Sequence, residues 1–136
     1  MLCLAPAGAA IMAEHAPKRD NRSGGVHHEF WRQFLKRKLH GAGYEVEEEV
    51  PLGGGKTVDM MGSKNGKRVY VEIETGRSNL AENVRKCGSI EGAVVFFFTE
   101  KDLVSKYQQI IREKENTNFL FLSPSDIKIL NQIINP

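Results

Sequence analysis

The chain has 136 residues, of which 40% are hydrophobic and 26% are charged, and its formal net charge is +2. These values are typical of one soluble globular domain, and they exclude a disordered, collagen-like or strongly basic chain. No stretch approaches the roughly 18 consecutive apolar residues of a transmembrane helix, so no membrane partner is expected. The two cysteines, Cys3 and Cys87, are too few for a disulfide framework or a zinc cluster. We therefore expect a cytoplasmic protein.

Residues 1–23 differ in composition from the rest of the chain, and we expect them to form a disordered or poorly ordered tail. The start of this segment is only faintly like a signal peptide, because it lacks a basic region and its apolar stretch is interrupted by Pro6 and Gly8. A start codon placed too early is the alternative, with Met12 as the true start. Residues 24–136 are then expected to form a single domain.

Hydrophobic periodicity and turn residues predict alternating helices and strands over this domain. Apolar residues at helical spacing indicate helices, as in the stripe that includes Phe30, Leu35 and Leu39. The run Ala93–Phe98 is apolar throughout, which is typical of a strand covered on both faces. The expected elements are a helix over 26–39, a strand over 44–50, two strands joined by a turn over 57–77, a helix over 80–89, a strand over 93–98, a helix over 99–113, a strand over 119–122 and a helix from 124.

The order α-β-β-β-α-β-α-β-α determines the expected fold class, which is α/β. Three early strands form a meander and two later strands join through a helical crossover, so we predict a mixed five-stranded sheet with helices on both faces. Local signals mark three helix starts. Asn79 is expected to cap one helix with Glu82, Thr99 to cap the next with Asp102, and Pro124 to open the last.

The most specific chemistry lies in the two strands on either side of Asn65-Gly66, a dipeptide typical of a tight hairpin turn. After the turn the sequence alternates, so Glu72 and Glu74 are expected on one face, about 7 Å apart. Before the turn, Asp59 lies in an apolar run, where an unpaired carboxylate would be costly. Three acids brought together by one hairpin repel one another unless a cation lies between them. Oxygen ligands of this kind suit Mg²⁺ or Mn²⁺.

This element order, with Asp59 in the second strand and Glu72-Ile73-Glu74 in the third, resembles the PD-(D/E)xK nuclease superfamily. The superfamily includes restriction endonucleases and Holliday-junction resolvases, and the resemblance covers roughly residues 24–134. It implies a restriction-endonuclease-like fold. In that family the two motif acids bind the divalent metal, and a Lys two residues after the second acid positions the attacking water. The resemblance therefore implies that Asp59 and Glu72 are metal ligands and catalytic residues.

The chain departs from the family motif at two positions. Val58 stands where the family has Pro, and Glu74 stands where Lys is usual. Glu74 cannot offer positive charge, so we expect it to be a further metal ligand or the general base. Arg77 and Lys86 are the two candidates for the missing charge, although a helical wheel turns Lys86 away from the buried stripe of its helix.

The group that the first helix contributes is open between His28 and Glu29. The helical wheel favours His28, which borders the buried stripe and could serve in the site or as a packed residue at the edge of the core. The surrounding segment 24–31, together with the later Glu-Ile-Glu-Thr-Gly strand end, is similar to variants found in mobile-element and archaeal proteins.

The function implied by the resemblance is a Mg²⁺- or Mn²⁺-dependent endonuclease that hydrolyses phosphodiester bonds in DNA, with branched or mobile-element DNA as candidate substrates. One alternative is an inactive nuclease fold that serves as a DNA-binding or assembly module; another is a small interaction protein whose acidic hairpin is a solvated surface. A homodimer would suit cleavage of two strands, and a helicase or other motor is a candidate partner. The residues expected to contact DNA are Lys64, Lys67, Arg68, Arg77, Asn83, Arg85 and Lys86.

Overall fold

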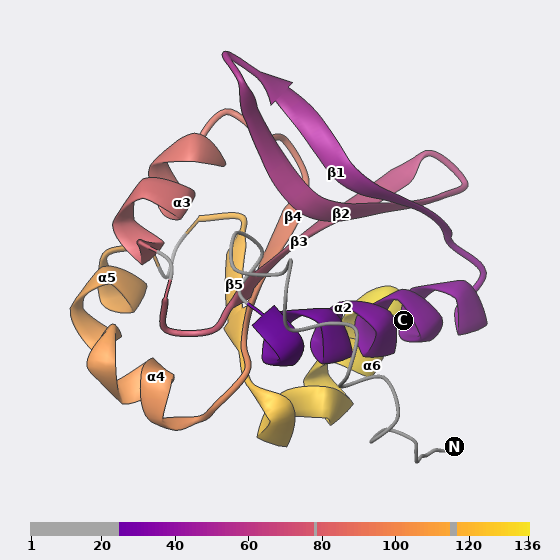
Figure 1. The fold of residues 1–136 in the computed structure, drawn as a ribbon. Coiled ribbons are helices and arrows are strands. Elements are labelled where there is room, and N and C mark those ends of the chain that lie inside the picture. Colours follow the sequence, from indigo (N-terminus) through magenta and orange to yellow (C-terminus); the bar gives the residue numbers. More distant parts are fainter. Residues whose placement is uncertain (1–24, 78, 115–116) are drawn as a thin grey trace.

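The computed structural model describes residues 25–77, 79–114 and 117–136 (Figure 1). The predicted tail over 1–23, with Cys3 and Met12, lies outside these ranges. Within them, no helix is both long enough and apolar enough to cross a membrane. The elements are α2 (Gly25–Gly41), β1 (Glu45–Gly53), β2 (Lys56–Lys64), β3 (Lys67–Glu74), α3 (Leu80–Lys86), β4 (Ala93–Phe98), α4 (Asp102–Lys106), α5 (Gln108–Glu113), β5 (Phe119–Leu122), the 3₁₀ turn η2 (Pro124–Asp126) and α6 (Ile127–Ile134).

The strands of the described residues form one five-stranded sheet in the order β1-β2-β3-β4-β5. β1, β2 and β3 are antiparallel neighbours, whereas β4 runs parallel to both β3 and β5. The parallel pairs are joined through α3 and through α4 with α5, because a strand that returns in the same direction needs a crossover. The predicted α/β class and mixed five-stranded sheet are confirmed.

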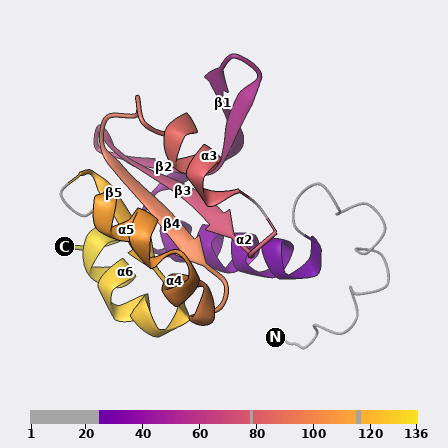
Figure 2. The same ribbon diagram turned by 90° about the vertical axis from the view of Figure 1, so that its left-hand side faces the viewer.

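The helices cover the two faces of the sheet separately. Figures 1 and 2 show α2 and α6 on one face and α3, α4 and α5 on the other, and the buried side chains divide into two clusters in the same way. In β4, Phe97 belongs to the α2 side, while Phe96 and Phe98 belong to the α3 side. The prediction that 93–98 is covered on both faces is confirmed. Burial of each such ring contributes roughly 1.5–3 kcal/mol.

The buried side chains of the first helix differ from the prediction at one residue. Leu35 and Leu39 are buried as expected, but the Phe30 side chain is 56% exposed. The ring of Trp31 packs against Phe97, with 5.1 Å between ring centroids, and Phe30 contacts the outer edge of Trp31. Trp31 therefore occupies the place over the sheet, and Phe30 is left at the surface.

Of the three predicted helix starts, two are confirmed and one is wrong. The side chain of Asn79 accepts a hydrogen bond from the Glu82 amide at 3.1 Å, and Pro124 opens η2 ahead of α6. Thr99 does not cap a helix, because Lys101 is the residue before α4. The backbone amide of Thr99 donates to the Glu74 carbonyl at 3.0 Å and extends the pairing of β4 with β3. Helix α4 starts three residues later, and a break at Tyr107 divides the predicted helix over 99–113 into α4 and α5.

Candidate active site

The candidate site lies where the pairing between β2 and β3 opens. The regular ladder runs from Lys64 opposite Lys67 to Met60 opposite Val71. One step further, the Asp59 amide donates to Glu72 Oε1 at 3.0 Å, and the Ile73 amide donates to Asp59 Oδ2 at 2.8 Å. Side-chain oxygens thus replace the backbone carbonyls that would continue the ladder. Both carboxylates are therefore fixed in the gap between the strands, each by a backbone amide of the opposite strand.

The neighbouring strand β1 is also irregular beside Asp59. Glu48 pairs with Met60 and Val50 pairs with Val58, but the intervening Glu49 has a φ of 52°. That is the left-handed region, which residues other than glycine and asparagine rarely adopt. The backbone around Asp59 is therefore shaped by irregular pairing on both sides, a feature often seen beside functional side chains.

The first helix contributes His28 rather than Glu29 to this gap. His28 is 6% exposed, and its Nε2 lies 3.2 Å from Asp59 Oδ1. Glu29 turns away and accepts hydrogen bonds from Arg32 and Gln33. Burial lowers the pKa of His28, but the hydrogen bond and the negative charge of Asp59 outweigh that effect, so the pKa lies above its usual value of 6.5. Asp59 is thereby held on one oxygen by a side chain and on the other by the backbone.

Helix α3 brings a cation to the same acids from the opposite face of the sheet. Lys86, the last residue of α3, places its Nζ 2.5 Å from Glu72 Oε2. Arg77, the other candidate for the missing charge, is exposed, and its backbone amide donates to Thr75 Oγ1. Burial lowers the pKa of Lys86, but the contact with Glu72 raises it further, so the net shift is upward and the ammonium form is favoured.

Glu72 is buried, and the contact with Lys86 does not fully offset the cost of burying its charge. Its side chain is 6% exposed, and its pKa is raised from 4.5 to about 7. Burial is the main cause and the negative charge of Asp59 is the next, while Lys86 and the Asp59 amide act in the opposite direction. An additional positive charge beside the two acids would therefore be favourable, because it would stabilise the ionised form of Glu72.

Glu74 has a different setting from the other two acids. It is 1% exposed, and its Oε2 accepts a hydrogen bond from Asn83 Nδ2 at 2.9 Å. The sequence predicts Asn83 near the site but not its hydrogen bond to Glu74. The spacing of these residues in the sequence could have predicted the contact. Residues 72 and 74 share one face of a strand, and residues 83 and 86 share one face of a helix, so two matched contacts could form between them.

The acids fit a two-carboxylate magnesium or manganese site better than a three-carboxylate one. Among the described residues, no group of three or more histidine, cysteine, aspartate or glutamate side chains is arranged to hold a metal ion. Mg²⁺ commonly uses one or two carboxylates together with water and substrate phosphate. Asp59 and Glu72 have the donor atoms for such a site, and burial together with the negative charge of Asp59 raises the pKa of Glu72. The role of Glu74 as a third ligand remains a prediction.

The three predicted DNA contacts at the β2–β3 turn lie far from these acids. Lys64 is five residues along β2 from Asp59, which corresponds to about 16 Å of strand. Its Nζ donates to the Ala42 carbonyl at 2.6 Å, and Lys67 Nζ donates to the Ile133 carbonyl at 3.0 Å. Arg68 is exposed nearby. The structure thus does not bring this group to the site, whereas Arg85 lies exposed on α3 next to Lys86.

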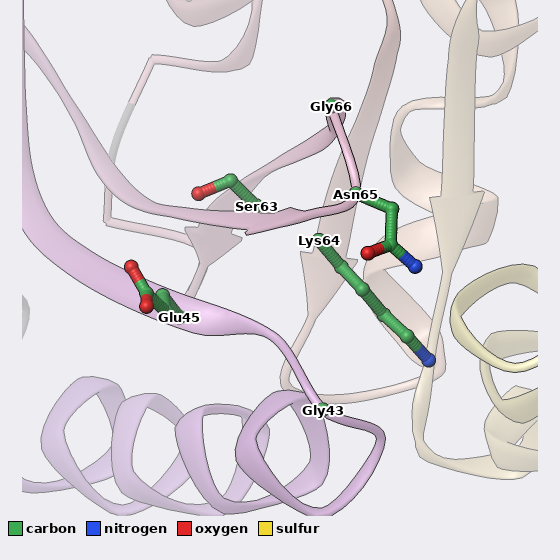
Figure 3. Close-up of a pocket in the computed structure, with 6 residues that line it drawn as sticks. All are labelled: Gly43, Glu45, Ser63, Lys64, Asn65 and Gly66. Atoms are coloured by element: carbon green, nitrogen blue, oxygen red, sulfur yellow. The ribbon is translucent and has the colours of Figure 1, made fainter.

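A shallow pocket opens at this same far end of the hairpin. Figure 3 shows the Lys64 side chain running from β2 toward the loop that follows α2, where its ammonium meets a backbone carbonyl. Asp59, Glu72 and Glu74 are absent from the pocket's lining. The pocket is therefore separate from the acidic site. Its lining residues are Gly43, Glu45, Ser63, Lys64, Asn65 and Gly66.

Comparison with protein-family models and with curated proteins found no match to this chain. The site is therefore defined by its geometry. Two carboxylates, from Asp59 and Glu72, meet in a strand gap, with the His28 imidazole on one side and the Lys86 ammonium on the other.

Proposed function

We propose that this chain is a Mg²⁺- or Mn²⁺-dependent endonuclease that hydrolyses phosphodiester bonds in DNA. The observation that carries the proposal is the meeting of Asp59, Glu72 and Lys86 from three different elements, with the Lys86 ammonium 2.5 Å from Glu72. Two carboxylates can bind a divalent cation, and a lysine beside them can stabilise the negative charge that develops on a phosphate under attack. The trio thus has the groups that this reaction requires.

Asp59 and Glu72 are the residues that would hold the metal ion. Such an ion supplies Lewis-acid activation of the phosphate and lowers the pKa of a bound water. The protein prepares both carboxylates in advance, because the Ile73 amide orients Asp59 and the Asp59 amide orients Glu72. Glu72 must be ionised to serve as a ligand, and its pKa of about 7 makes metal binding stronger at pH 8 than at pH 6.

Lys86 takes the role that the family resemblance gives to the motif lysine. Its pKa is raised by Glu72, so it stays an ammonium and acts as a positive charge toward the substrate phosphate or the attacking water. Because it comes from α3, the position two residues after Glu72 need not be a lysine. This accounts for Glu74 at the motif position without loss of the charge.

His28 is a positioning residue in this scheme. Its contact with Asp59 Oδ1 fixes the orientation of that carboxylate from the α2 side. Arg77 and Arg85 are exposed on the segments next to Glu72 and Lys86, and we assign them to contacts with the DNA backbone. Such contacts give affinity without sequence information and weaken as salt concentration rises.

The decisive experiment measures cleavage of labelled linear duplex, single-stranded and four-way-junction DNA in Mn²⁺ or Mg²⁺. Asp59→Asn, Glu72→Gln and Lys86→Met are each expected to lower the rate by roughly 100-fold or more, as loss of a charge-stabilising group does in other enzymes. Two exposed residues outside the site provide matched controls, Glu47→Gln for the acids and Lys101→Met for the lysine. Cleavage that survives both acid substitutions would overturn the proposal.

The second candidate is a nuclease fold that binds DNA without cutting it. The observation that favours it is that every carboxylate oxygen of Asp59 and Glu72 already has a protein partner, from His28, Ile73, Asp59 itself or Lys86. A site satisfied in this way can persist for structural reasons. Salt-sensitive DNA binding with no cleavage of any of the three substrates would establish this candidate and exclude the enzyme.

A further inference from the structure

The buried acid at the motif-lysine position has a partner that indicates its role. We propose that Glu74 is a positioning residue that, through Asn83, holds helix α3 so that Lys86 reaches Glu72. This inference rests on the proposed nuclease function and deepens it. In this role Glu74 neither binds the metal nor transfers a proton, and Asn83 acts together with it.

Two parallel contacts join β3 to α3. Asn83 Nδ2 donates to Glu74 Oε2 at 2.9 Å, and Lys86 Nζ donates to Glu72 Oε2 at 2.5 Å. The acids are two residues apart on one face of a strand, and the donors are three residues apart on one face of a helix. The first contact therefore fixes the register in which the second can form.

Helix α3 needs such a constraint because it is short. It has seven residues, and isolated helices of fewer than about 12 residues are marginal in water. Leu80 and Val84 of α3, together with Cys87 directly after it, pack in the core on this face of the sheet. Apolar contacts are non-directional, so they set the distance of α3 from the sheet more firmly than its rotation. A hydrogen bond from Asn83 to a buried carboxylate has a defined geometry and fixes that rotation.

The burial of the three acids supports a division of roles. The Asp59 side chain is 17% exposed and that of Glu72 is 6% exposed, whereas Glu74 as a residue is 1% exposed. A metal shared with a substrate phosphate must be reached from solvent, and Glu74 is the least accessible of the three. Its backbone carbonyl also pairs with the Thr99 amide, which places it inside the regular sheet between β3 and β4.

An isosteric series separates positioning from ligand or base chemistry. In Glu74→Gln the amide oxygen still accepts from Asn83, so we expect cleavage within about fivefold of the wild-type rate, because a charge-assisted hydrogen bond becomes a neutral one. Glu74→Ala removes the acceptor and is expected to lose at least about 50-fold, since Lys86 is no longer held. A Glu74→Gln protein as inactive as Glu74→Ala would overturn the proposal.

Exchanging the carboxylate and the amide between positions 74 and 83 tests their hydrogen bond, because the exchange should restore cleavage that a single substitution removes. Asn83→Asp alone places two carboxylates against each other and is expected to be inactive. The double variant Glu74→Gln/Asn83→Asp restores one amide donor and one carboxylate acceptor of the same lengths, now with the carboxylate on α3. We expect its cleavage to recover to within about tenfold of wild type. Failure of the double variant to exceed Asn83→Asp would contradict the positioning role.

Mn²⁺ binding measured by calorimetry provides a readout besides activity. Positioning predicts that Glu74→Gln binds Mn²⁺ within about twofold of wild type, whereas Asp59→Asn loses binding. A direct ligand role predicts at least a tenfold loss for Glu74→Gln. The latter result would overturn the assignment.

Hydrogen exchange of the α3 amides separates failure of this inference from failure of the proposed function. We expect exchange at residues 83–86 to be about fivefold faster in Glu74→Ala and close to the wild-type rate in Glu74→Gln. If wild type neither binds Mn²⁺ nor cuts DNA, the nuclease proposal fails, and the exchange rates still decide whether Glu74 holds α3. Equal exchange in Glu74→Ala and wild type would overturn the positioning role.

Discussion

The two ends of the β2–β3 hairpin differ in how they use their polar groups. At the turn end the backbone ladder is regular, and Lys64 and Lys67 donate to the backbone carbonyls of Ala42 and Ile133. At the open end the ladder stops, and backbone amides of the same two strands donate to the carboxylates of Asp59 and Glu72. The polar groups at the turn end of the hairpin therefore hold the fold together, whereas those at the open end form the candidate site.

The two ends of the hairpin also differ in how their charged side chains are balanced. The lysines at the turn end meet carbonyls beside the C-termini of α2 and α6, and positive charge at such positions stabilises a helix by roughly 0.3–1 kcal/mol. At the open end, burial and the negative charge of Asp59 raise the pKa of Glu72 to about 7 despite Lys86. The open end, where a buried charge disfavours folding, is the end at which we propose that a cation binds. Four measurements test this difference between the two ends of the hairpin.

The largest effect on stability is expected from pH. The pKa of Glu72 is raised from 4.5 to about 7, so between these values the folded chain retains a proton that the unfolded chain has released. The free energy of unfolding should therefore fall by about 3 kcal/mol as pH rises from 4.5 to 8. His28, whose pKa is raised above 6.5, adds a loss of the same sign above that pH. Urea unfolding across this range measures the effect.

A matched pair of variants tests the origin of that slope. Glu72→Gln should remove most of the decline, whereas Glu45→Gln, on the exposed side of β1, should leave it unchanged. An unaltered slope in Glu72→Gln would show that the open end does not carry the charge imbalance.

The second effect is stabilisation by a divalent cation. At pH 8, Mn²⁺ at 100 times its dissociation constant should raise the free energy of unfolding by about 2.7 kcal/mol, because it binds the folded state alone. Thermal unfolding measures this shift. Asp59→Asn should abolish the shift, and Glu47→Gln should keep it. Equal shifts in Asp59→Asn and wild type would remove Asp59 from the metal site.

The third effect follows from removal of the cation on α3. Lys86→Met keeps the length of the side chain but leaves Glu72 buried without its ammonium partner, which should cost about 2 kcal/mol at pH 8. At pH 5.5 Glu72 is largely protonated and the loss should be smaller. Denaturant unfolding at the two pH values measures the difference. The adjacent exposed Arg85→Met should change stability by less than about 0.5 kcal/mol.

The smallest effect concerns the irregular position in β1. Glu49 has a φ of 52°, which glycine adopts without strain, so Glu49→Gly should raise the free energy of unfolding by about 1 kcal/mol. Its side chain accepts a hydrogen bond from Thr57 Oγ1 at 3.4 Å, a weak contact whose loss subtracts little. A destabilised Glu49→Gly protein would indicate that the surrounding structure compensates for the strain. Asn65, with the same φ, suits its turn and serves as the comparison.

The sequence predicts the sheet, its order and the meeting of Asp59 with Glu72, because strand alternation and the Asn65-Gly66 turn determine that neighbourhood. It names Lys86 as one of two candidates for the positive charge beside the acids, but it does not decide between Lys86 and Arg77. A helical wheel identifies the stripe that contacts the core and turns Lys86 away from it. In the structure, Asn83 and Lys86 nevertheless both reach the acids of β3. The strand gap itself is also hidden, since it depends on two backbone amides.

Other misses have the same tertiary origin. Thr99 has the residue pattern of a helix cap, but its amide is used by the neighbouring strand. Phe30 has the spacing of a core residue, but Trp31 fills the space over Phe97. Periodicity determines which residues could be buried, and competition between neighbours determines which of them are.

The outer strand β1 has a consequence for how the chain can assemble. It lies at one edge of the sheet, where unpaired backbone groups usually invite a strand from another molecule. Three features of β1 oppose that addition. Its exposed glutamates carry like charges, Pro51 has no backbone amide to donate, and the left-handed conformation of Glu49 interrupts the extended backbone. These features disfavour edge-to-edge sheet extension, a common route to aggregation, on this side, so we expect any pairing of two copies to use another surface.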